Sequence, residues 1–321
     1  MINSSQFIKK CIKQKSAENK NNCNCYQLAP FRYVDGILFL SREETLRIDG
    51  TITMELIREK IPKIQVVSSL ELLQYDYLTP DSEIYQIIYS VNLEMTNAKA
   101  WYRLLPEADF LDLSKSECEV LLNYNNLEEI QNIIIKLTEC MKNIPGPYFV
   151  KTGLCSTKKN IQPRPVFDAK DALYHLLSSN NVKQSLENGK CKGILVQPWR
   201  TDINPNVEFR VFVRSGVVTA ASQQYLYEIY PIMYYWEAET VILAFQTLWD
   251  SFKDRLPENL TIRDSVFDGY LTTTIDGEVI AHLIEINSGA FGWGPAGSAL
   301  FDWEYEPPPQ IGEPRELRVT V

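Results

Sequence analysis

The chain has 321 residues, of which 45% are hydrophobic and 23% are charged, and its formal net charge is −9. This composition is typical of globular proteins, the length suffices for two or three packed units, and the acidic balance argues against nucleic acid as a partner. No apolar run reaches the ~18 residues of a membrane helix, and the first residues lack the apolar segment of a signal peptide. We therefore expect a cytoplasmic protein with no membrane partner, whose seven scattered cysteines are reduced.

The first part of the chain changes character after its polar beginning. Residues 1–26 are rich in Lys, Asn and Ser, which predicts a frayed helix followed by a mobile segment. Residues 27–145 are expected to form an N-terminal α/β region. Its apolar runs predict a strand at residues 36–40, a helix, a short strand and a further helix start within residues 50–75, and helix-rich structure at residues 82–105.

The clearest helix is predicted at residues 126–144. Its apolar residues recur at helical spacing, Asn126 is a suitable N-cap, and Pro145 stops the helix. We expect an organisational boundary at this break.

A short strand and a basic loop follow in residues 148–160. The strand carries Lys151, and the loop, which contains Gly and Ser, carries Lys158 and Lys159. Cations in this arrangement can hold nucleotide phosphates, whereas the alternative is an ordinary lysine that faces solvent. The sequence does not distinguish Lys158 from Lys159 as the phosphate contact.

One helix is predicted within residues 167–189, and a buried strand and a hairpin are predicted within residues 193–225. The buried strand ends at Gln197, Pro198 and Trp199, because a proline is unfavourable in a central ladder. Backbone groups left unpaired at such a strand end can bind the edge of an adenine ring.

A hairpin turn is predicted at residues 215–216. A two-residue turn there places Arg210 opposite Ala221 and Glu208 opposite Gln223. A Glu/Arg pair beside a small alanine suits a sheet surface that faces phosphate. The alternative is an ordinary half-exposed hairpin.

The strongest short hairpin signal is Asp276-Gly277. A two-residue turn at residues 276–277 places Asp268 opposite Glu285, with Asn287 on the same face, and the opposite face, which includes Ile275, resembles a core. Like charges directly opposed destabilise a sheet unless something lies between them. Two carboxylates and an amide oxygen suit Mg²⁺, particularly Mg²⁺ that carries nucleotide phosphates. The alternative is an exposed hairpin with scattered acids.

The order of these pieces resembles the ATP-grasp superfamily: a strand lysine, a linker strand ending in Gln-Pro-Trp, a Glu-Phe-Arg strand, and a final hairpin with Asp and Glu-x-Asn. The finer resemblance is to the cell division cycle protein 123 family. The segments that carry it are residues 149–151, 173–181, 193–199, 207–225, 267–270, 284–287 and 298–304. It implies an α+β ATP-grasp fold, in which two α+β subdomains with antiparallel sheets sandwich a nucleotide, plus a mixed helix-rich N-terminal region.

The resemblance covers roughly residues 145–305 and, together with composition, divides the chain. Residues 1–26 would be the mobile segment, 27–145 the N-terminal α/β region, 146–305 the ATP-grasp nucleotide-binding region, and 306–321 an extended proline-rich arm.

The resemblance also assigns site residues. Carried over by position, Lys151 contacts phosphate, Gln197 and Trp199 line the adenine side, the catalytic Arg210 contacts phosphate or the transferred group, and Asp268, Glu285 and Asn287 hold Mg²⁺. The basic loop adds Lys158 and the hairpin register adds Glu208 to this set of nucleotide contacts.

Three departures from the family pattern affect this assignment. Glu285 stands where aspartate is expected, and Leu177 stands where a lysine is expected before Ser178 and Ser179. Residues 152–160 also lack the expected Trp-containing stretch that runs into Pro-Lys-Asp. The partner-binding role is therefore less well supported than the nucleotide site. The Asn-, Lys- and Ile-rich composition suits an AT-rich genome, such as that of a large virus or an intracellular microbe, in which case the cytoplasm is that of a host cell.

Three functions follow from these observations. Members of the resembled family bind the gamma subunit of eukaryotic translation initiation factor 2 and promote assembly of that factor, which implies an ATP-binding chaperone, here expected as a monomer. The second hypothesis is an ATP-dependent carboxylate–amine ligase that acts through an acyl-phosphate and releases ADP and phosphate. The third is a degenerate scaffold that binds no nucleotide, against which the retained site residues argue. The sequence leaves open whether ATP is hydrolysed or only bound.

Overall fold

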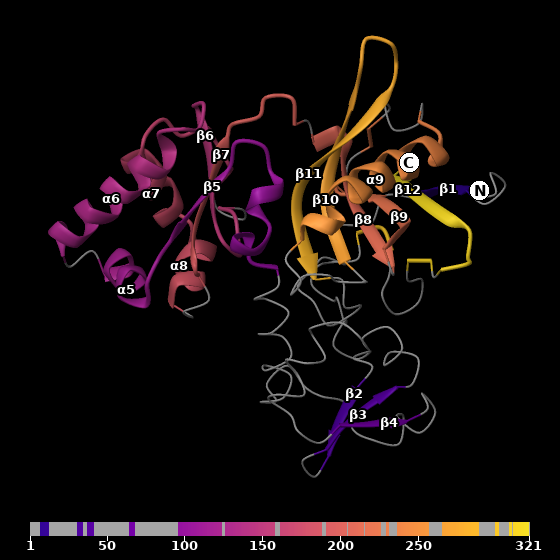
Figure 1. Cartoon of the computed structure of the whole chain (residues 1–321), viewed down its shortest axis with the longest axis horizontal. Helices are drawn as coiled ribbons and strands as arrows, with labels where there is room; N and C mark the ends of the chain where they lie inside the picture. The colour runs from indigo at the N-terminus through magenta and orange to yellow at the C-terminus, as the bar shows by residue number, and fades with distance from the viewer. Residues whose placement is uncertain are drawn as a thin grey trace. The chain divides into compact units, whose positions relative to one another are not determined.

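The computed structural model shows two compact units, a smaller one of residues 96–202 and a larger one formed by residues 1–95 and 203–321 (Figure 1). This division differs from the boundaries expected near residues 26, 145 and 305, because the C-terminal strand belongs to the sheet of the larger unit. The residues that the structure describes are 7–12, 31–34, 37–41, 64–67, 96–123, 126–157, 161–187, 191–203, 205–214, 216–225, 229–230, 236–256, 265–288, 299–301, 308–309 and 311–320.

The smaller unit combines an antiparallel sheet with helices. Its elements are η2 Ala98–Ala100, η3 Tyr102–Leu104, β5 Asp109–Asp112, α5 Lys115–Asn123, α6 Leu127–Met141, β6 Tyr148–Thr152, α7 Ala169–Leu177, α8 Asn180–Glu187 and β7 Gly193–Pro198. The sheet has the strand order β5–β7–β6, so β7 is its central strand. Both neighbours run antiparallel to β7.

The helices of this unit pack on one face of its sheet. Val150 on β6 and Ile194 and Val196 on β7 belong to a buried apolar cluster that includes side chains from α5, α6, α7 and α8. Successive residues of a strand point to opposite faces. The other face of the sheet therefore carries Lys151 and Leu195, which lie opposite each other on β6 and β7.

Two helix predictions can be compared with this unit. Helix α6 confirms the helix predicted at residues 126–144, and the side chain of Asn126 caps it by accepting a hydrogen bond from the Glu129 N–H at 3.2 Å. Residues 167–189 form the two helices α7 and α8, so the prediction of a single helix is wrong. The break follows Ser178, whose hydroxyl and backbone N–H both donate to the Tyr174 carbonyl of the preceding turn.

The larger unit contains a six-stranded sheet and one long helix. Its elements are β1 Phe7–Ile12, η4 Pro205–Val207, β8 Glu208–Arg214, β9 Val217–Gln223, α9 Ala238–Phe252, η6 Lys253–Arg255, β10 Ser265–Thr273, β11 Val279–Ser288 and β12 Arg315–Thr320. The strand order is β1–β12–β9–β8–β10–β11. Strands β8 to β11 pair antiparallel, whereas β12 pairs parallel with β1 and with β9.

Helix α9 covers one face of the six-stranded sheet through aromatic contacts. The ring of Phe245 lies 5.7 Å from that of Phe209 on β8 and 5.9 Å from that of Phe267 on β10. The next residues on these strands, Arg210 and Asp268, point to the other face. In both units, the candidate residues on the strands therefore share the face opposite the described α-helices.

Two terminal segments are strands, contrary to expectation. Strand β1 lies within residues 1–26, where a frayed helix and a mobile segment were expected. Strand β12 lies within residues 306–321, where an extended arm was expected. The two pair in parallel from Phe7 opposite Arg315 to Ile12 opposite Thr320. Each is a short run whose pairing partner is almost the whole chain away, so its own sequence carries little signal.

In the sequence between β1 and residue 96, the structure describes three short strands. They are β2 Phe31–Val34, β3 Ile37–Ser41 and β4 Ile64–Val67. Strand β3 pairs antiparallel with β2 and parallel with β4, which confirms the strands predicted at residues 36–40 and within residues 50–75. The helices predicted within residues 50–75, and most of residues 82–105, lie outside the described residues.

The fold class is α+β, as expected. Each of the two units combines helices with a sheet whose strands are mainly antiparallel, which is the composition expected of an ATP-grasp fold. Within the described ranges, no helix has the length and apolar character that crossing a membrane requires.

Candidate functional site

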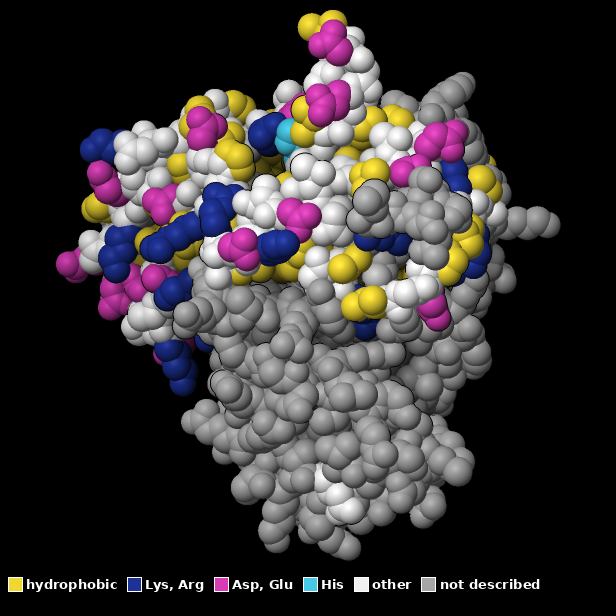
Figure 2. All heavy atoms as spheres, turned by 45° about the vertical axis from the view of Figure 1, so that its right-hand side comes forward, with side chains coloured by type: hydrophobic (Ala, Val, Ile, Leu, Met, Phe, Trp, Pro, Cys, Tyr) yellow, Lys and Arg dark blue, Asp and Glu magenta, His cyan; other side chains and the backbone are white. Residues whose placement is uncertain are grey.

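The tip of the β10–β11 hairpin is a three-residue loop. Thr274 and Glu278 close it, with the Thr274 N–H donating to the Glu278 carbonyl at 2.9 Å and the Gly277 N–H donating to the Thr274 carbonyl at 3.0 Å. The two-residue turn predicted at residues 276–277 is therefore wrong. The expected core position of Ile275 is wrong as well, because its side chain is fully exposed at the tip. Figure 2 shows apolar and acidic side chains at this projecting end.

A β-bulge restores the predicted pairing further along the same hairpin. Next to the loop, Thr273 pairs with Val279, one residue away from the predicted register. Ile284 is then an extra residue on β11, so that Glu285 lies opposite Asp268 as predicted. The longer loop and the bulge shift the register in opposite directions and cancel at the two carboxylates.

The β8–β9 hairpin contains a bulge whose register shift no second irregularity offsets. The pairs next to the turn fit a two-residue turn, but Thr219 is an extra residue on β9. Arg210 therefore lies opposite Ser222, and the prediction that it lies opposite Ala221 is wrong. The same bulge displaces the partner of Glu208 by one residue, because Gln223 pairs with Phe209, so the prediction that Glu208 lies opposite Gln223 is wrong too.

Arg210 and Asp268 lie opposite each other on β8 and β10 and form an ion pair with two hydrogen bonds. Arg210 Nε donates to Asp268 Oδ1 and Nη2 donates to Oδ2, each at 2.8 Å. The side chains are 13% and 5% exposed, so water and salt screen this pair only weakly. Burial alone would lower the pKa of Arg210, but the charge and hydrogen bonds of Asp268, together with the charge of Glu285, raise that pKa above its ordinary value.

Asn287 lies on the same face as Glu285, two residues further along β11. Its side-chain nitrogen Nδ2 is buried and has no hydrogen-bond partner among the described residues. The nitrogen and oxygen of an amide exchange places when the side chain flips. Asn287 is therefore able to turn its oxygen toward a ligand at this face.

These residues fit a magnesium ion that carries phosphate. Two carboxylates and an amide are hard oxygen ligands, and Mg²⁺ in nucleotide sites takes one or two carboxylates and completes its shell with phosphate oxygens and water. Asp268, Glu285 and Asn287 would supply three such ligands, and phosphate oxygens and water would complete the shell.

In the smaller unit, Lys151 is held in a buried position on β6. Its side chain is only 6% exposed, and its Nζ lies 5.5 Å from the centre of the Trp101 ring. A cation over an aromatic face is stabilised electrostatically, most strongly where water is excluded. Trp101 is itself buried, and its indole N–H donates to the Thr96 carbonyl at 3.1 Å. The sequence pattern gave no sign of the contact between Trp101 and Lys151.

Gln197 and Trp199 lie at the end of β7 on the same face as Lys151. Phe149 lies opposite Gln197, and its ring is 6.4 Å from that of Trp199. The Trp199 N–H donates to the Pro147 carbonyl at 2.7 Å, so this backbone donor is already used. On the other side of β7, pairing with β5 ends at Val196, before Gln197. That side of the strand end is where a backbone contact to a ligand could form.

Lys158 and Lys159 lie outside the described residues, so their predicted contacts with phosphate stay predictions. Glu208 lies at the start of β8, two residues before Arg210 on the same face. The larger unit thus brings together Glu208, Arg210, Asp268, Glu285 and Asn287. The smaller unit brings together Lys151, Gln197 and Trp199.

The chain is similar to known proteins both in sequence and in fold. A model of the D123 family matches residues 166–309 of the chain. The structure of C-terminally truncated Cdc123 from Schizosaccharomyces pombe matches with a TM-score of 0.54 and 19% identity, covering 73% of this chain and 98% of that one. A second structure of Cdc123 from the same organism matches with a TM-score of 0.52 and 19% identity, covering 72% of this chain and 97% of that one. No curated protein sequence matches the chain.

A RimK domain ATP-grasp protein from Sphaerobacter thermophilus also matches, with a TM-score of 0.32 and 12% identity, covering 73% of this chain and 86% of that one. The D123 match and the Cdc123 fold agree with the family indicated by the sequence motifs. The matched stretch contains every described candidate residue except Lys151, which precedes it.

Proposed function

With residues 166–309 assigned to the D123 family and the fold identified as that of Cdc123, we propose that this protein binds ATP together with Mg²⁺. The observation that carries the proposal is the group on β8, β10 and β11. Arg210, Asp268, Glu285 and Asn287 occupy one face of the sheet, and Asn287 has a buried amide nitrogen without a partner among the described residues. A scaffold that binds nothing would have little reason to place a half-buried carboxylate, Glu285, opposite the buried carboxylate of Asp268.

The chain's own residues would divide the work as follows. Asp268 and Glu285 supply the negative charge that attracts the cation, and Asn287 supplies a neutral oxygen. Arg210 neutralises Asp268 in the structure described here and is placed to share its donors with a phosphate when one arrives. Bound Mg²⁺ would neutralise phosphate charge. In the smaller unit, Lys151 would add a further cation, and Gln197 and Trp199 would contact the base.

Calorimetric titration with ATP, with and without Mg²⁺, tests the proposal. We expect binding that depends on Mg²⁺ in the native protein and is lost in the double variant Asp268→Asn/Glu285→Gln. The matched control is Asp276→Asn/Glu278→Gln, which makes the same chemical changes at exposed positions of the same hairpin and should bind like the native protein. Absence of binding in the native protein would refute the proposal and leave the scaffold interpretation.

We further propose that the protein acts as an assembly factor for eukaryotic translation initiation factor 2 by binding its gamma subunit. The support is the D123 match over residues 166–309, which includes the 173–181 and 298–304 segments that resemble the cell division cycle protein 123 family. Pull-down of purified gamma subunit by the immobilised protein is the test, with the Asp268→Asn/Glu285→Gln variant alongside. Retention of the subunit supports the role, and no retention by the native protein contradicts it.

A ligase is the second candidate, because Arg210 lies beside the metal ligands where an acyl-phosphate would develop negative charge. In such a reaction the carboxylate attacks the terminal phosphate of ATP and ADP leaves. The amine then displaces phosphate from the acyl-phosphate, so continued ADP release would depend on both a carboxylate and an amine. Screening amino acids and short peptides for stimulated ADP release tests it. If ATP binds but no carboxylate and amine pair stimulates ADP release, the assembly role is favoured over the ligase.

A further inference from the structure

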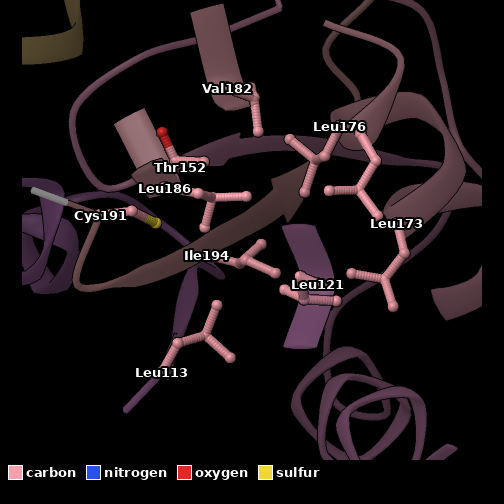
Figure 3. A pocket seen from close by; sticks show the side chains of 10 residues that line it. Leu113, Leu121, Thr152, Leu173, Leu176, Val182, Leu186, Cys191 and Ile194 are labelled. Carbon is pink, nitrogen blue, oxygen red and sulfur yellow. The ribbon is translucent and has the colours of Figure 1, made fainter. Parts of the chain in front are cut away.

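A small apolar cavity lies inside the smaller unit, away from the candidate nucleotide residues (Figure 3). It has room for roughly one molecule of the size of water. The residues that line it are Leu113, Leu121, Thr152, Leu173, Leu176, Leu177, Val182, Leu186, Cys191 and Ile194. Figure 3 shows the Cys191 sulfur among these aliphatic side chains. The thiol of Cys191 therefore borders a small internal space.

A second thiol, that of Cys118, lies next to Cys191. Cys118 is on α5, Cys191 lies just before β7, and they are 3% and 4% exposed. Cys118 Sγ donates to the Cys191 carbonyl at 3.7 Å, and Cys191 Sγ donates to the Gly193 carbonyl at 3.4 Å. The Cys118 sulfur therefore lies against the backbone of Cys191, and a local movement of the two side chains would be needed to join the two sulfurs.

The contact makes the two thiols chemically different. The hydrogen bond from Cys191 lowers the pKa of Cys118, and it outweighs burial and the charges of Glu117 and Glu119, which act in the opposite direction. The same contact and burial raise the pKa of Cys191. Because the thiolate is the reactive form of cysteine, Cys118 is the nucleophile of the pair and Cys191 its partner. Elsewhere in this unit, burial and Asp109 raise the pKa of the Cys140 thiol to about 12, which leaves it inert.

We propose that Cys118 and Cys191 form a disulfide when the protein meets hydrogen peroxide. The Cys118 thiolate attacks one peroxide oxygen, the O–O bond breaks, and the departing hydroxide takes a proton to become water. Cys118 is then a sulfenic acid. The Cys191 sulfur attacks the Cys118 sulfur, the S–O bond breaks, and the hydroxyl leaves as a second water with the Cys191 proton. Two thiols and one peroxide thus give one disulfide and two waters.

The disulfide would join α5 to the chain just before β7. The two cysteines are 73 residues apart, so the bond would close a long loop and restrict the unfolded chain. Strand β7 is the central strand of the smaller unit and ends at Pro198, between Gln197 and Trp199. Oxidation therefore raises the thermal stability of this unit and fixes the start of the strand whose other end carries the candidate base contacts.

Peptide mapping under non-reducing conditions tests the proposal on the native protein. After treatment with hydrogen peroxide and alkylation of the remaining thiols, we expect a Cys118–Cys191 cross-linked peptide that dithiothreitol separates. The melting temperature should rise on oxidation and return on reduction. Recovery of Cys118 and Cys191 as alkylated or singly oxidised residues, or pairing of either with Cys155, would overturn the proposal.

Single variants separate the pair from other thiols. Cys118→Ser and Cys191→Ser should each abolish the cross-link and the rise in melting temperature. Cys140→Ser, which removes a half-buried thiol of the same unit, should retain both. If a pair variant fails to fold, the mapping of the native protein still decides the matter, because it identifies the bonded residues directly.

Discussion

Arg210 and Asp268 neutralise each other across β8 and β10 through two hydrogen bonds of 2.8 Å. The sequence motifs assign the two residues to different ligands, Arg210 to phosphate and Asp268 to Mg²⁺. In the structure each is the partner of the other, and Glu285 adds a second negative charge near the guanidinium. A cation that arrives at Asp268 and Glu285 would compete with Arg210 for the same carboxylate and release it toward the phosphates. The pair therefore links metal binding to the position of Arg210.

The first prediction concerns the removal of Arg210. Arg210→Met leaves Asp268 as a buried carboxylate without this partner, and breaking a buried ion pair costs about 3 kcal/mol of the free energy of unfolding. If Mg²⁺ binds at Asp268 and Glu285, it should restore part of this loss, because the ion replaces the missing positive charge. Urea denaturation with and without Mg²⁺ measures both effects.

A control variant isolates the carboxylate in this experiment. In Arg210→Met/Asp268→Asn both charges are absent, so we expect a smaller loss of stability than in Arg210→Met and no response to Mg²⁺. Equal denaturation midpoints of Arg210→Met with and without Mg²⁺ would contradict a metal site at Asp268.

The facing carboxylates were predictable from the sequence, but only through two deviations that cancel. The alternation of apolar residues around Asp276-Gly277 indicated the hairpin and its faces. The pattern does not reveal that the loop contains three residues, nor that Ile284 forms a bulge. At Thr219 a similar bulge changes the partner of Arg210 from Ala221 to Ser222. Bulges depend on how the sheet twists and packs against its neighbours, which a local pattern cannot encode.

The second prediction tests the bulge beside Asp268. A Cβ atom at Gly269 would lie 2.8 Å from the His282 carbonyl oxygen and 2.9 Å from a ring carbon of Phe245. Gly269→Ala should therefore lower the free energy of unfolding by about 1–3 kcal/mol through overpacking and should weaken ATP binding by displacing Asp268. Thr273→Ala, an exposed position on the same strand, should change the stability by less than ~0.5 kcal/mol. A Gly269→Ala protein with native stability and affinity would show that the close approach is unimportant.

Local sequence patterns predicted the helices better than they predicted the strands at the two ends of the chain. Helix α6 was recognisable because its spacing and the Asn126 cap are both local. Strands β1 and β12 were missed because their stability comes from pairing with each other and, for β12, with β9. In residues 167–189 the helical spacing was correct, but the break at Ser178 depends on one side chain that bonds its own helix. Sequence reasoning therefore recovers elements that stabilise themselves and loses those that depend on distant partners.

The third prediction concerns Lys151, whose phosphate role rests on position alone. Lys151→Met keeps the length of the side chain and replaces a buried cation by an apolar group next to Trp101, so stability should be maintained. The affinity for ATP should fall roughly tenfold, which corresponds to about 1.4 kcal/mol. Lys99→Met is the control, since Lys99 is half exposed and pairs with Asp112 at 2.7 Å. Unchanged ATP affinity in Lys151→Met would remove this residue from the site.

His175 on α7 is buried, with 4% of its surface exposed. Its Nε2 lies 3.2 Å from Thr157 Oγ1, with which it shares a hydrogen bond. Burial lowers the pKa of His175, the charge of Arg164 lowers it further, and Asp171 opposes them. The folded protein therefore holds a neutral imidazole in a pH range where the unfolded chain, with its ordinary pKa near ~6.5, already binds a proton.

The fourth prediction follows from this difference in proton binding. Because the unfolded state binds more protons, the free energy of unfolding should decrease as the pH falls below ~6.5, and the decrease should stop once the pH is below the lowered pKa of the folded protein. Urea denaturation at several pH values between 7.5 and 5 measures the slope, above the range where carboxylates add their own effects. His175→Gln should flatten it, whereas His282→Gln, which changes the other histidine of the chain, should leave the His175 contribution intact. If the native protein and His175→Gln lose stability equally over this range, the buried imidazole is not the group responsible.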